Sequence, residues 1–390
     1  MRIAIVAGSD AGHAFPALAL AERYAAAGDQ ATVFSGLKWQ RAAARRGIDL
    51  AELPGLAAVD TDDDSDAGDK LSVRAARMTL QLEPVLQDGG FDLVVCDVIT
   101  VAGGWAAQRC SLPWIELSPH PLYLPSVGLP PIGSGLAAGT GWRGRARDAA
   151  MRAATSMSVR QGEQQRSRAR ASIGMSAAGE PDARFVATLP GLEVYRPDWP
   201  AGAHLVGPLL WEPTDEIFDR PTGSEPLVVI APSTAVTGAA DMVATALRAL
   251  RADELGQQVR VVISSLTPPD DAEVAAFGGP IAAGLGRQDE LLTHADLAIC
   301  GAGHGMLAKT LLAGVPVLAV PGGGDQWELA NRLERTGAGR LIRPVTVAGL
   351  RDGVRAVLAD PGYAAAARRV GATGTQVVDP VEVSHRVVGQ

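Results

Sequence analysis

A chain of 390 residues, 47% of them hydrophobic and only 20% charged, is long enough to bury the cores of two domains. Its formal net charge of −8 argues against a general nucleic-acid-binding surface and against a surface for anionic membranes. The sequence has no leader pattern and no apolar run of ~18 residues, and its 3 cysteines are far apart, which together predict a reduced, cytoplasmic protein without a membrane span.

The first predicted elements place a histidine at the end of a buried strand. Residues 2–7, which are apolar after Arg2, form a run typical of a strand in a parallel sheet, and residues 16–27 have the composition of a helix. His13 lies in the turn between them, at the edge where open α/β sheets bind ligands. Imidazole titrates near neutrality and suits a general base, although a lone histidine at a turn is more often a cap or a bystander.

A carboxylate follows the strand predicted over residues 91–97. Asp97 ends this strand and stands before a helix predicted over residues 102–109. Catalytic imidazoles are commonly oriented by a carboxylate on the far ring nitrogen, so Asp97 is a candidate partner of His13. The alternative is that Asp97 caps the following helix, and both roles can hold at once.

The rest of the first half contains surface-like segments and two further strands. Residues 60–69 form an acidic tract without the glycine and glutamate spacing of a calcium loop, which predicts a solvated loop. Residues 119–141 are rich in proline and glycine, as expected of a lid, a binding loop or a disordered segment. Residues 142–173 read as an arginine-rich helix, and residues 185–194 and 204–209 as strands.

Composition divides the chain into two domains. Proline, glycine and acidic residues mark residues 208–226 as the linker. Residues 1–207 then form the N-terminal domain, and residues 227–375, where strand and helix patterns alternate again, form the C-terminal domain. The last segment, residues 376–390, is predicted to contain a final helix.

The most informative stretch begins with a strand over residues 296–300 and a glycine-rich turn over residues 301–305. A helix over residues 306–313 follows, and its first N–H groups have no partner within the helix. Aligned peptide dipoles add positive charge there, so the turn suits a phosphate or diphosphate. The spacing is that of neither a P-loop nor a dinucleotide fingerprint, and a tight turn packed for structural reasons alone is the alternative.

A second strand–turn–helix unit follows directly. Residues 317–320 form a strand, residues 321–324 a glycine turn, and residues 326–336 a helix with Asp325 as its predicted N-cap. Because neighbouring strand ends face one crevice, Asp325 and Gln326 can reach whatever group is attached to the phosphate.

These residues resemble the donor-binding pattern of bacterial nucleotide-sugar glycosyltransferases of the GT-B fold, which decorate natural products and antibiotics. The family's phosphate-contacting histidine falls on Gly301 and its hydroxyl residue on Met306, so two side-chain donors are lost, and His304 is a candidate replacement for one. The resemblance implies an α/β chain of two Rossmann-like domains whose parallel sheets face a central cleft, with the last helix returning to the first domain. It rests on Gly12-His13-Ala14-Phe15-Pro16, Gly301-Ala302-Gly303-His304-Gly305-Met306, Gly314-Val315-Pro316, Pro321, Asp325-Gln326 and Asn331.

The resemblance also assigns roles to matching residues. It makes His13 the base that deprotonates the acceptor hydroxyl and Asp97 its partner, and it places Asp325 and Gln326 on the hydroxyls of the donor sugar. The implied donor-binding set is Ser233, Thr234, Gln288, Gly301, Ala302, Gly303, His304, Gly305, Met306, Asp325 and Gln326. The implied acceptor-binding residues are His120, Leu122, Tyr123 and Leu124.

The expected reaction is an inverting, metal-independent transfer from a nucleoside-diphosphate sugar to a hydroxyl of a small, apolar or lipid-like acceptor. No metal-ligand spacing is present in the sequence, and no cofactor other than the sugar-nucleotide co-substrate is expected. The resemblance allows a homodimer. Three alternatives stay open: a sugar-nucleotide epimerase of the same fold, a catalytically silent nucleotide-sugar-binding protein, and a C-glycosyltransferase.

Overall fold

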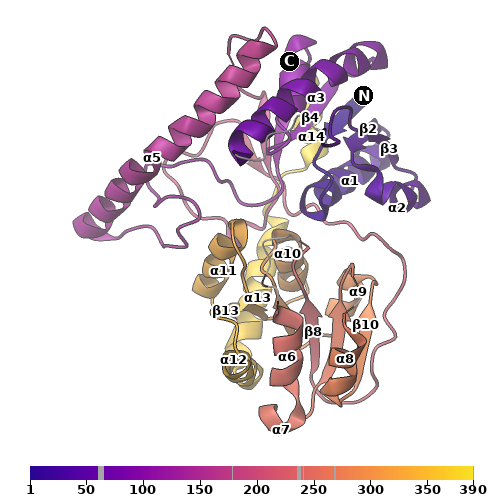
Figure 1. Cartoon of the computed structure of the whole chain (residues 1–390), viewed down its shortest axis with the longest axis vertical. Coiled ribbons are helices and arrows are strands. Elements are labelled where there is room, and N and C mark those ends of the chain that lie inside the picture. The colour runs from indigo at the N-terminus through magenta and orange to yellow at the C-terminus, as the bar shows by residue number, and fades with distance from the viewer. Residues whose placement is uncertain (60–65, 178, 235–238, 240, 268, 390) are drawn as a thin grey trace.

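The chain folds into two α/β units, each built on one parallel sheet (Figure 1). This computed structural model describes residues 1–59, 66–177, 179–234, 239, 241–267 and 269–389. Within these ranges the first sheet has 7 strands in the order β3-β2-β1-β4-β5-β6-β7, and the second has 6 in the order β10-β9-β8-β11-β12-β13. Two separate parallel sheets of this kind are the expected architecture.

The N-terminal unit places helices on both faces of its sheet. Ile3 and Ile5 of the first strand pack into one hydrophobic cluster, and Ala4 and Val6 pack into another on the opposite face. Both faces of the strand are therefore buried, which explains its continuous apolar sequence. Its elements are β1 (Arg2–Val6), α1 (Ala11–Ala26), β2 (Gln30–Ser35), η1 (Leu37–Trp39), α2 (Gln40–Arg45), β3 (Asp49–Glu52), α3 (Ala67–Gly89), β4 (Leu93–Asp97), α4 (Ala102–Arg109), β5 (Trp114–Ser118), α5 (Gly141–Ser172), β6 (Ala183–Val186), η2 (Pro190–Leu192) and β7 (Ala203–Leu205).

The C-terminal unit repeats this arrangement. All residues of its central strand β8 are buried, and its neighbours β9 and β11 pair with it in parallel. Its elements are β8 (Leu227–Ala231), α6 (Met242–Leu250), α7 (Ala252–Leu255), β9 (Arg260–Ser264), α8 (Asp271–Phe277), β10 (Ile281–Gly284), α9 (Gln288–Leu292), β11 (Leu297–Cys300), α10 (His304–Leu312), β12 (Val317–Ala319), α11 (Asp325–Thr336), β13 (Gly339–Leu341), α12 (Val347–Ala359), α13 (Pro361–Ala372), η3 (Thr373–Thr375) and α14 (Pro380–Val388).

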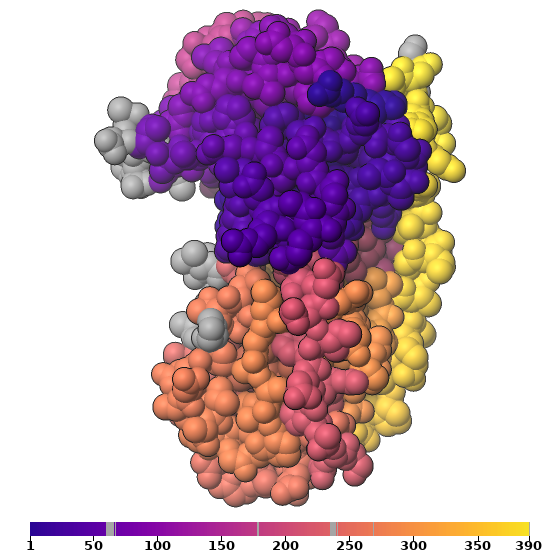
Figure 2. Space-filling view, turned by 90° about the vertical axis from the view of Figure 1, so that its right-hand side faces the viewer, coloured from indigo at the N-terminus to yellow at the C-terminus, as the bar shows by residue number. Residues whose placement is uncertain are grey.

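The end of the chain joins the two units. Figure 2 shows the last residues, in yellow, running along one side of the molecule from the C-terminal unit onto the N-terminal unit. There α14 packs against α1, and the Tyr24 hydroxyl lies 2.6 Å from the Ser384 hydroxyl in a buried position. The His385 imidazole also lies 2.8 Å from the Asp29 carboxylate. The C-terminal segment therefore holds the two sheets in one arrangement.

Several element boundaries differ from the sequence predictions. α1 begins at Ala11 rather than at residue 16, which places His13 inside the first helical turn. The strand predicted over residues 185–194 ends at Val186, because Pro190 opens a 3₁₀ turn. α11 is preceded by Gly324 with φ 67°, so Asp325 is the first helical residue and not the N-cap.

The acidic tract is partly helical where it can be described. Residues 60–65 lie outside the described residues. Asp66 is the N-cap of α3, and its carboxylate accepts hydrogen bonds from the N–H groups of Gly68 and Asp69 at 2.9 and 3.1 Å. The end of the predicted loop is therefore a helix start, stabilised in the way expected of an aspartate at this position.

Candidate functional site

A histidine–aspartate pair lies at the carboxyl edge of the N-terminal sheet. His13 follows β1, and Asp97 ends the neighbouring strand β4. His13 Nδ1 is 2.9 Å from Asp97 Oδ1, and the Thr100 hydroxyl donates to Asp97 Oδ2 at 3.1 Å. Asp97 is only 1% exposed, so these bonds fix its carboxylate. With Nδ1 held by Asp97, Nε2 is the ring nitrogen that can take a proton from a substrate.

The surroundings of His13 favour its protonated form. Burial, the largest single influence, lowers the pKa of His13, but the hydrogen bond and charge of Asp97 and the charges of Asp10 and Asp325 together outweigh it. The net pKa is therefore raised above the ordinary value of 6.5. Asp325 belongs to the C-terminal unit, so its charge acts on His13 from the other unit.

The glycine turn after β11 presents open backbone N–H groups. α10 begins at His304, and the N–H group of Leu307 donates to the carbonyl oxygen of the N-cap Gly303 at 3.1 Å. The N–H groups of the helical residues before Leu307 have no carbonyl partner within the helix. A Cβ atom at Gly303 or Gly305 would meet nothing within 4 Å, so the backbone has open space on the Cβ side of these two residues. The anion site that the sequence predicts at this turn stays a prediction.

The two departures from the family pattern have structural reasons. A Cβ atom on Gly301 would lie 2.9 Å from Ser233 Cβ, so the family's histidine does not fit unless Ser233 moves. Met306 packs against buried clusters of the C-terminal unit. The backbone of Ala302 has a left-handed φ of 60° and its side chain is fully buried, so this residue shapes the turn.

His304 does not replace the missing donor. Its Nε2 lies 2.9 Å from the Thr188 hydroxyl of the N-terminal unit, and the side chain is buried. Burial, with a smaller effect from the charge of His120, lowers the pKa of His304 to about 3. His304 is therefore a neutral contact between the two units and carries no positive charge toward an anion at the turn.

Asp325 and Gln326 have different environments. Gln326 is 3% exposed: its Oε1 accepts from Gly322 N at 2.9 Å, and its Nε2 donates to Ser233 Oγ at 2.7 Å. Both ends of this amide are thus used to connect the glycine turn with the end of β8, rather than presented to a sugar as the resemblance implied. Asp325 is exposed, and so is Thr234 beside Ser233.

Gln288 is also held by protein groups. Its Oε1 accepts from Lys309 Nζ at 3.0 Å, and its Nε2 donates to Ser264 Oγ at 3.0 Å. Lys309 forms a buried ion pair with Glu212 of the linker, with 2.7 Å between Nζ and Oε1. Sequence analysis missed this pair, although a lysine inside the apolar helix of residues 306–313 is a usable signal, because buried lysines are nearly always paired.

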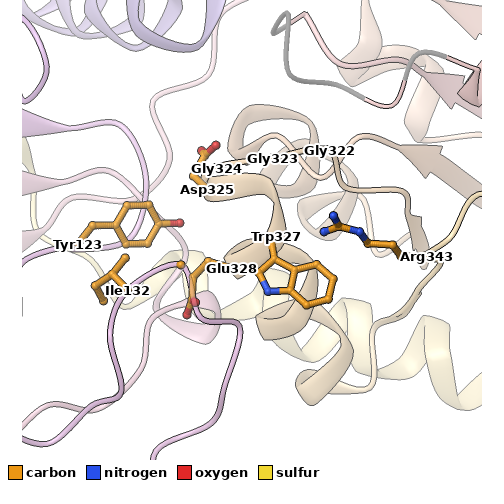
Figure 3. Close-up of a pocket in the computed structure, with 10 residues that line it drawn as sticks. Tyr123, Ile132, Gly322, Gly323, Gly324, Asp325, Trp327, Glu328 and Arg343 are labelled. Atoms are coloured by element: carbon orange, nitrogen blue, oxygen red, sulfur yellow. The ribbon is translucent and has the colours of Figure 1, made fainter. Parts of the chain in front are cut away.

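The loop over residues 119–141 contributes only part of its predicted lining. Leu122 is 2% exposed and belongs to a small hydrophobic cluster, against which the partly buried Leu124 packs, so Leu122 has little surface to offer an acceptor. His120 stacks on Tyr123, with ring centroids 4.3 Å apart. Tyr123 lines a cavity of about 410 Å³ between this loop and the start of α11 (Figure 3).

The described residues form neither a metal-binding cluster nor a membrane-spanning helix. Across the described ranges, no group of three or more His, Cys, Asp and Glu side chains is arranged to hold a metal ion. Within the same ranges, no helix combines the length and apolar character needed to cross a membrane. Cys96, Cys110 and Cys300 are free thiols.

Comparisons with known proteins point to one kind of enzyme. No family model matches the chain. It is 25% identical to 4'-demethylrebeccamycin synthase of Lentzea aerocolonigenes over 337 residues, which is 80% of this chain and 78% of that protein. The glycosyltransferase SnogD from Streptomyces nogalater superposes with a TM-score of 0.72 at 20% identity, covering 100% of this chain and 99% of that one.

A further solved structure resembles the chain over its whole length. The glycosyltransferase SsfS6 from Streptomyces sp. SF2575, complexed with thymidine diphosphate, superposes with a TM-score of 0.67 at 17% identity, covering 100% of both chains. At these identities the structures establish the fold. The class of enzyme is supported by sequence relatives such as UDP-glucosyltransferase 1 of Beauveria bassiana, which is 27% identical over 183 residues, or 45% of this chain and 40% of that protein. They favour a glycosyltransferase over the epimerase and the silent binding protein. With its two facing parallel sheets and these relatives, the chain is a glycosyltransferase of the GT-B fold, similar to bacterial antibiotic glycosyltransferases.

Proposed function

We propose that the protein transfers a sugar from a nucleoside-diphosphate sugar to a hydroxyl group of a small, largely apolar acceptor, with inversion at the anomeric carbon and without a metal ion. The observation that carries this proposal is the pair of His13 and Asp97, 2.9 Å apart on one unit and within reach of the charge of Asp325 on the other. A base and a sugar-binding carboxylate on opposite sides of one gap are what a direct displacement requires.

His13 is the proposed general base. Its Nε2 takes the proton of the acceptor hydroxyl while the hydroxyl oxygen forms a bond to the anomeric carbon. The bond from that carbon to the diphosphate oxygen breaks, and its electron pair leaves with the diphosphate. Attack from the side opposite the leaving group inverts the anomeric configuration. The imidazolium formed on His13 is stabilised by the buried Asp97 carboxylate, which holds Nδ1–H.

The backbone at the start of α10 is the proposed site for the diphosphate. The N–H groups of His304, Gly305 and Met306 and the positive end of the helix dipole stabilise the negative charge that develops on the leaving group. Gly303 and Gly305 leave room for close approach of the phosphates. This arrangement supplies charge compensation from the main chain, which is why we propose that no metal ion is needed.

Other residues are assigned to the sugar and to the nucleotide of the donor. We assign the sugar hydroxyls to the exposed Asp325 and to Thr234. Gln326 and Ser233, which hydrogen-bond each other at 2.7 Å, then act by holding the glycine turn in place. We assign Gln288, on α9, to the nucleotide base on the family resemblance alone. Because the neighbour SsfS6 was solved with thymidine diphosphate, dTDP-sugars and UDP-sugars are the donors to test first.

The test combines a transfer assay with a separate measurement of donor binding. The protein is incubated with dTDP-glucose or UDP-glucose and a panel of phenolic and alcoholic acceptors, and the anomeric configuration of any product is read by NMR. We expect a glycoside of inverted configuration, formed at the same rate with and without EDTA. Retention of configuration, or loss of transfer in EDTA, would contradict the proposed mechanism.

The His13→Ala variant separates catalysis from binding. Its transfer rate should fall about 10²–10⁴-fold, the usual contribution of a general base. The nucleoside diphosphate should still raise its stability, by about 2.7 kcal/mol at 100 times the dissociation constant. A variant with normal transfer would remove the base assignment.

A further inference from the structure

A cavity of about 410 Å³ lies between the loop over residues 119–141 and the start of α11. Its walls come from both units: Tyr123, Ile132 and Gly133 from the N-terminal unit, and Gly322–Gly324, Asp325, Trp327, Glu328 and Arg343 from the C-terminal unit. Its volume is that of a typical small-molecule pocket. Asp325, to which the sugar hydroxyls are assigned, lines this cavity, so the cavity adjoins the proposed donor site.

Two hydrogen-bond donors at this cavity lack protein partners. The Tyr123 hydroxyl is buried and has no hydrogen-bond partner. Its ring is held by stacking on His120 and by the Arg332 guanidinium, 5.6 Å from the ring centroid. In Figure 3 the hydroxyl points from the loop toward the middle of the cavity. A buried hydroxyl without a partner is costly, so this position is consistent with a ligand atom that accepts its hydrogen bond.

The second donor is the Arg343 guanidinium on the opposite wall (Figure 3). It lies over the Trp327 ring, 4.9 Å from the ring centroid. Trp327 is itself fixed, because its Nε1 donates to Ser134 O at 3.3 Å. No hydrogen bond or ion pair to Arg343 is present among the residues that the structure describes. Arg343 therefore presents a positioned cation without a counter-charge at the rim of the cavity.

The carboxylates of the cavity do not neutralise this cation. Glu328 Oε1 accepts from Arg332 Nε at 3.1 Å, and its Oε2 accepts from Gly135 N at 3.0 Å, so both of its oxygens are already held by protein donors. Asp325 lies on the edge away from Arg343, and its carboxylate points away from Trp327 (Figure 3). A ligand's anionic group that pairs with Arg343 would therefore lie on the side of the cavity remote from Asp325.

We propose that this cavity binds the distal part of the acceptor and that this part carries an acidic group, such as a carboxylate on an aromatic or other apolar body. Arg343 pairs with the acidic group, Tyr123 donates to an oxygen of the body, and Ile132 and Trp327 contact its apolar surface. The inference rests on the proposed function and deepens it, because it names hydroxylated apolar acids as the acceptor class. Arg343 is then a specificity residue that acts on binding and takes no part in bond making.

The test measures binding apart from turnover. Dissociation constants of 6-hydroxy-2-naphthoate and of its methyl ester are determined by titration calorimetry on the full chain saturated with dTDP. We expect the wild-type protein to bind the acid about fivefold more tightly than the ester, as for a partly screened ion pair, and the preference to shrink at high salt. Arg343→Met should remove the preference by weakening the acid alone, whereas Tyr123→Phe should weaken both ligands.

Arg340→Met is the matched control, because Arg340 lies on β13 close in sequence but outside the cavity lining. This variant should keep the preference. Equal affinities for acid and ester, failure of both to bind, or an Arg343→Met protein that keeps the preference would overturn the acidic subsite. If acid and ester bind alike but both are glycosylated, the transferase proposal stands without the subsite. If the acid is preferred but no sugar is transferred to any acceptor, the subsite stands and the base-catalysed transfer fails.

Discussion

Replacing Asp97 by asparagine removes one negative charge and leaves the shape of the side chain unchanged. Asp97 is 1% exposed and lies 2.9 Å from His13 Nδ1. The asparagine oxygen can still accept from Nδ1–H, so the variant tests the charge rather than the geometry. The activity of a histidine base rises with pH as the imidazole loses its proton, and the midpoint of this rise reports the pKa of His13.

The structure gives the direction in which the pKa of His13 should move. The hydrogen bond and charge of Asp97 are the main reasons why the pKa of His13 is raised above 6.5, and burial, which lowers it, is the largest single influence. Without the carboxylate, the acid limb of kcat/KM should therefore move to lower pH. The plateau value should fall about 10²–10⁴-fold, because the imidazolium loses its counter-charge.

The assay is kcat/KM for sugar transfer from pH 5 to 9 for the wild type and the variant. Asp10→Asn is the control, since Asp10 is exposed and also raises the pKa of His13 through its charge. The control should lose less than about threefold in rate, because exposed charges are screened. An Asp97→Asn protein of near-normal rate, or one whose acid limb moves to higher pH, would refute this account of His13.

Three further predictions concern stability. Gly301→Ala places a Cβ atom 2.9 Å from that of Ser233 and should cost about 1–3 kcal/mol of unfolding free energy while weakening nucleotide binding. Glu328→Ala leaves the buried Arg332 without one of its carboxylates and should cost about 3 kcal/mol. His304→Gln should flatten the acid-side stability profile: the unfolded chain binds a proton at His304 below pH 6.5, whereas the folded chain, with a pKa of about 3, does not. As the pH drops from 6.5 toward 4, the wild-type protein should therefore lose unfolding free energy faster than the variant. The difference between the two slopes should reach up to about 1.4 kcal/mol per pH unit.

Urea unfolding measures all three variants. Glu334→Ala is the control for Glu328→Ala, because Glu334 is on the same helix but exposed, and it should cost less than about 1 kcal/mol. Equal losses of unfolding free energy in Glu328→Ala and Glu334→Ala would contradict the role assigned to the buried ion pair between Glu328 and Arg332. If Gly301→Ala left the unfolding free energy and nucleotide binding unchanged, Ser233 would be shown to move aside at little energetic cost. Parallel pH profiles for wild type and His304→Gln would show that His304 titrates normally.

Features encoded in short stretches of sequence could be predicted. The apolar run 227–231 and the helix at 102–109 match β8 and α4, because burial and helix composition act on neighbouring residues. The turns at Gly12-His13 and Gly301–Gly305 lie at strand ends, and parallel sheets bring such ends to one edge. Asp97 lies beside His13 for the same reason, since β1 and β4 are neighbours.

Partners far apart in the sequence could not be predicted. Gln326 is bound to Ser233 across 93 positions, and His304 to Thr188 across 116, so their side chains are used inside the protein. Nothing local distinguishes these polar residues from ligand-binding ones. Leu122 and Tyr123 are adjacent, yet one enters the core and the other the cavity, because neighbouring residues of an extended loop point in opposite directions.

The most direct test of the central claim is the position of the diphosphate in a crystal structure of the complex with dTDP or UDP. The account predicts phosphate oxygens within about 3.2 Å of the backbone nitrogens of Gly305 and Met306, with Nε2 of His13 facing the same gap. A diphosphate bound to arginine side chains elsewhere, or one separated from His13 by the protein, would contradict it.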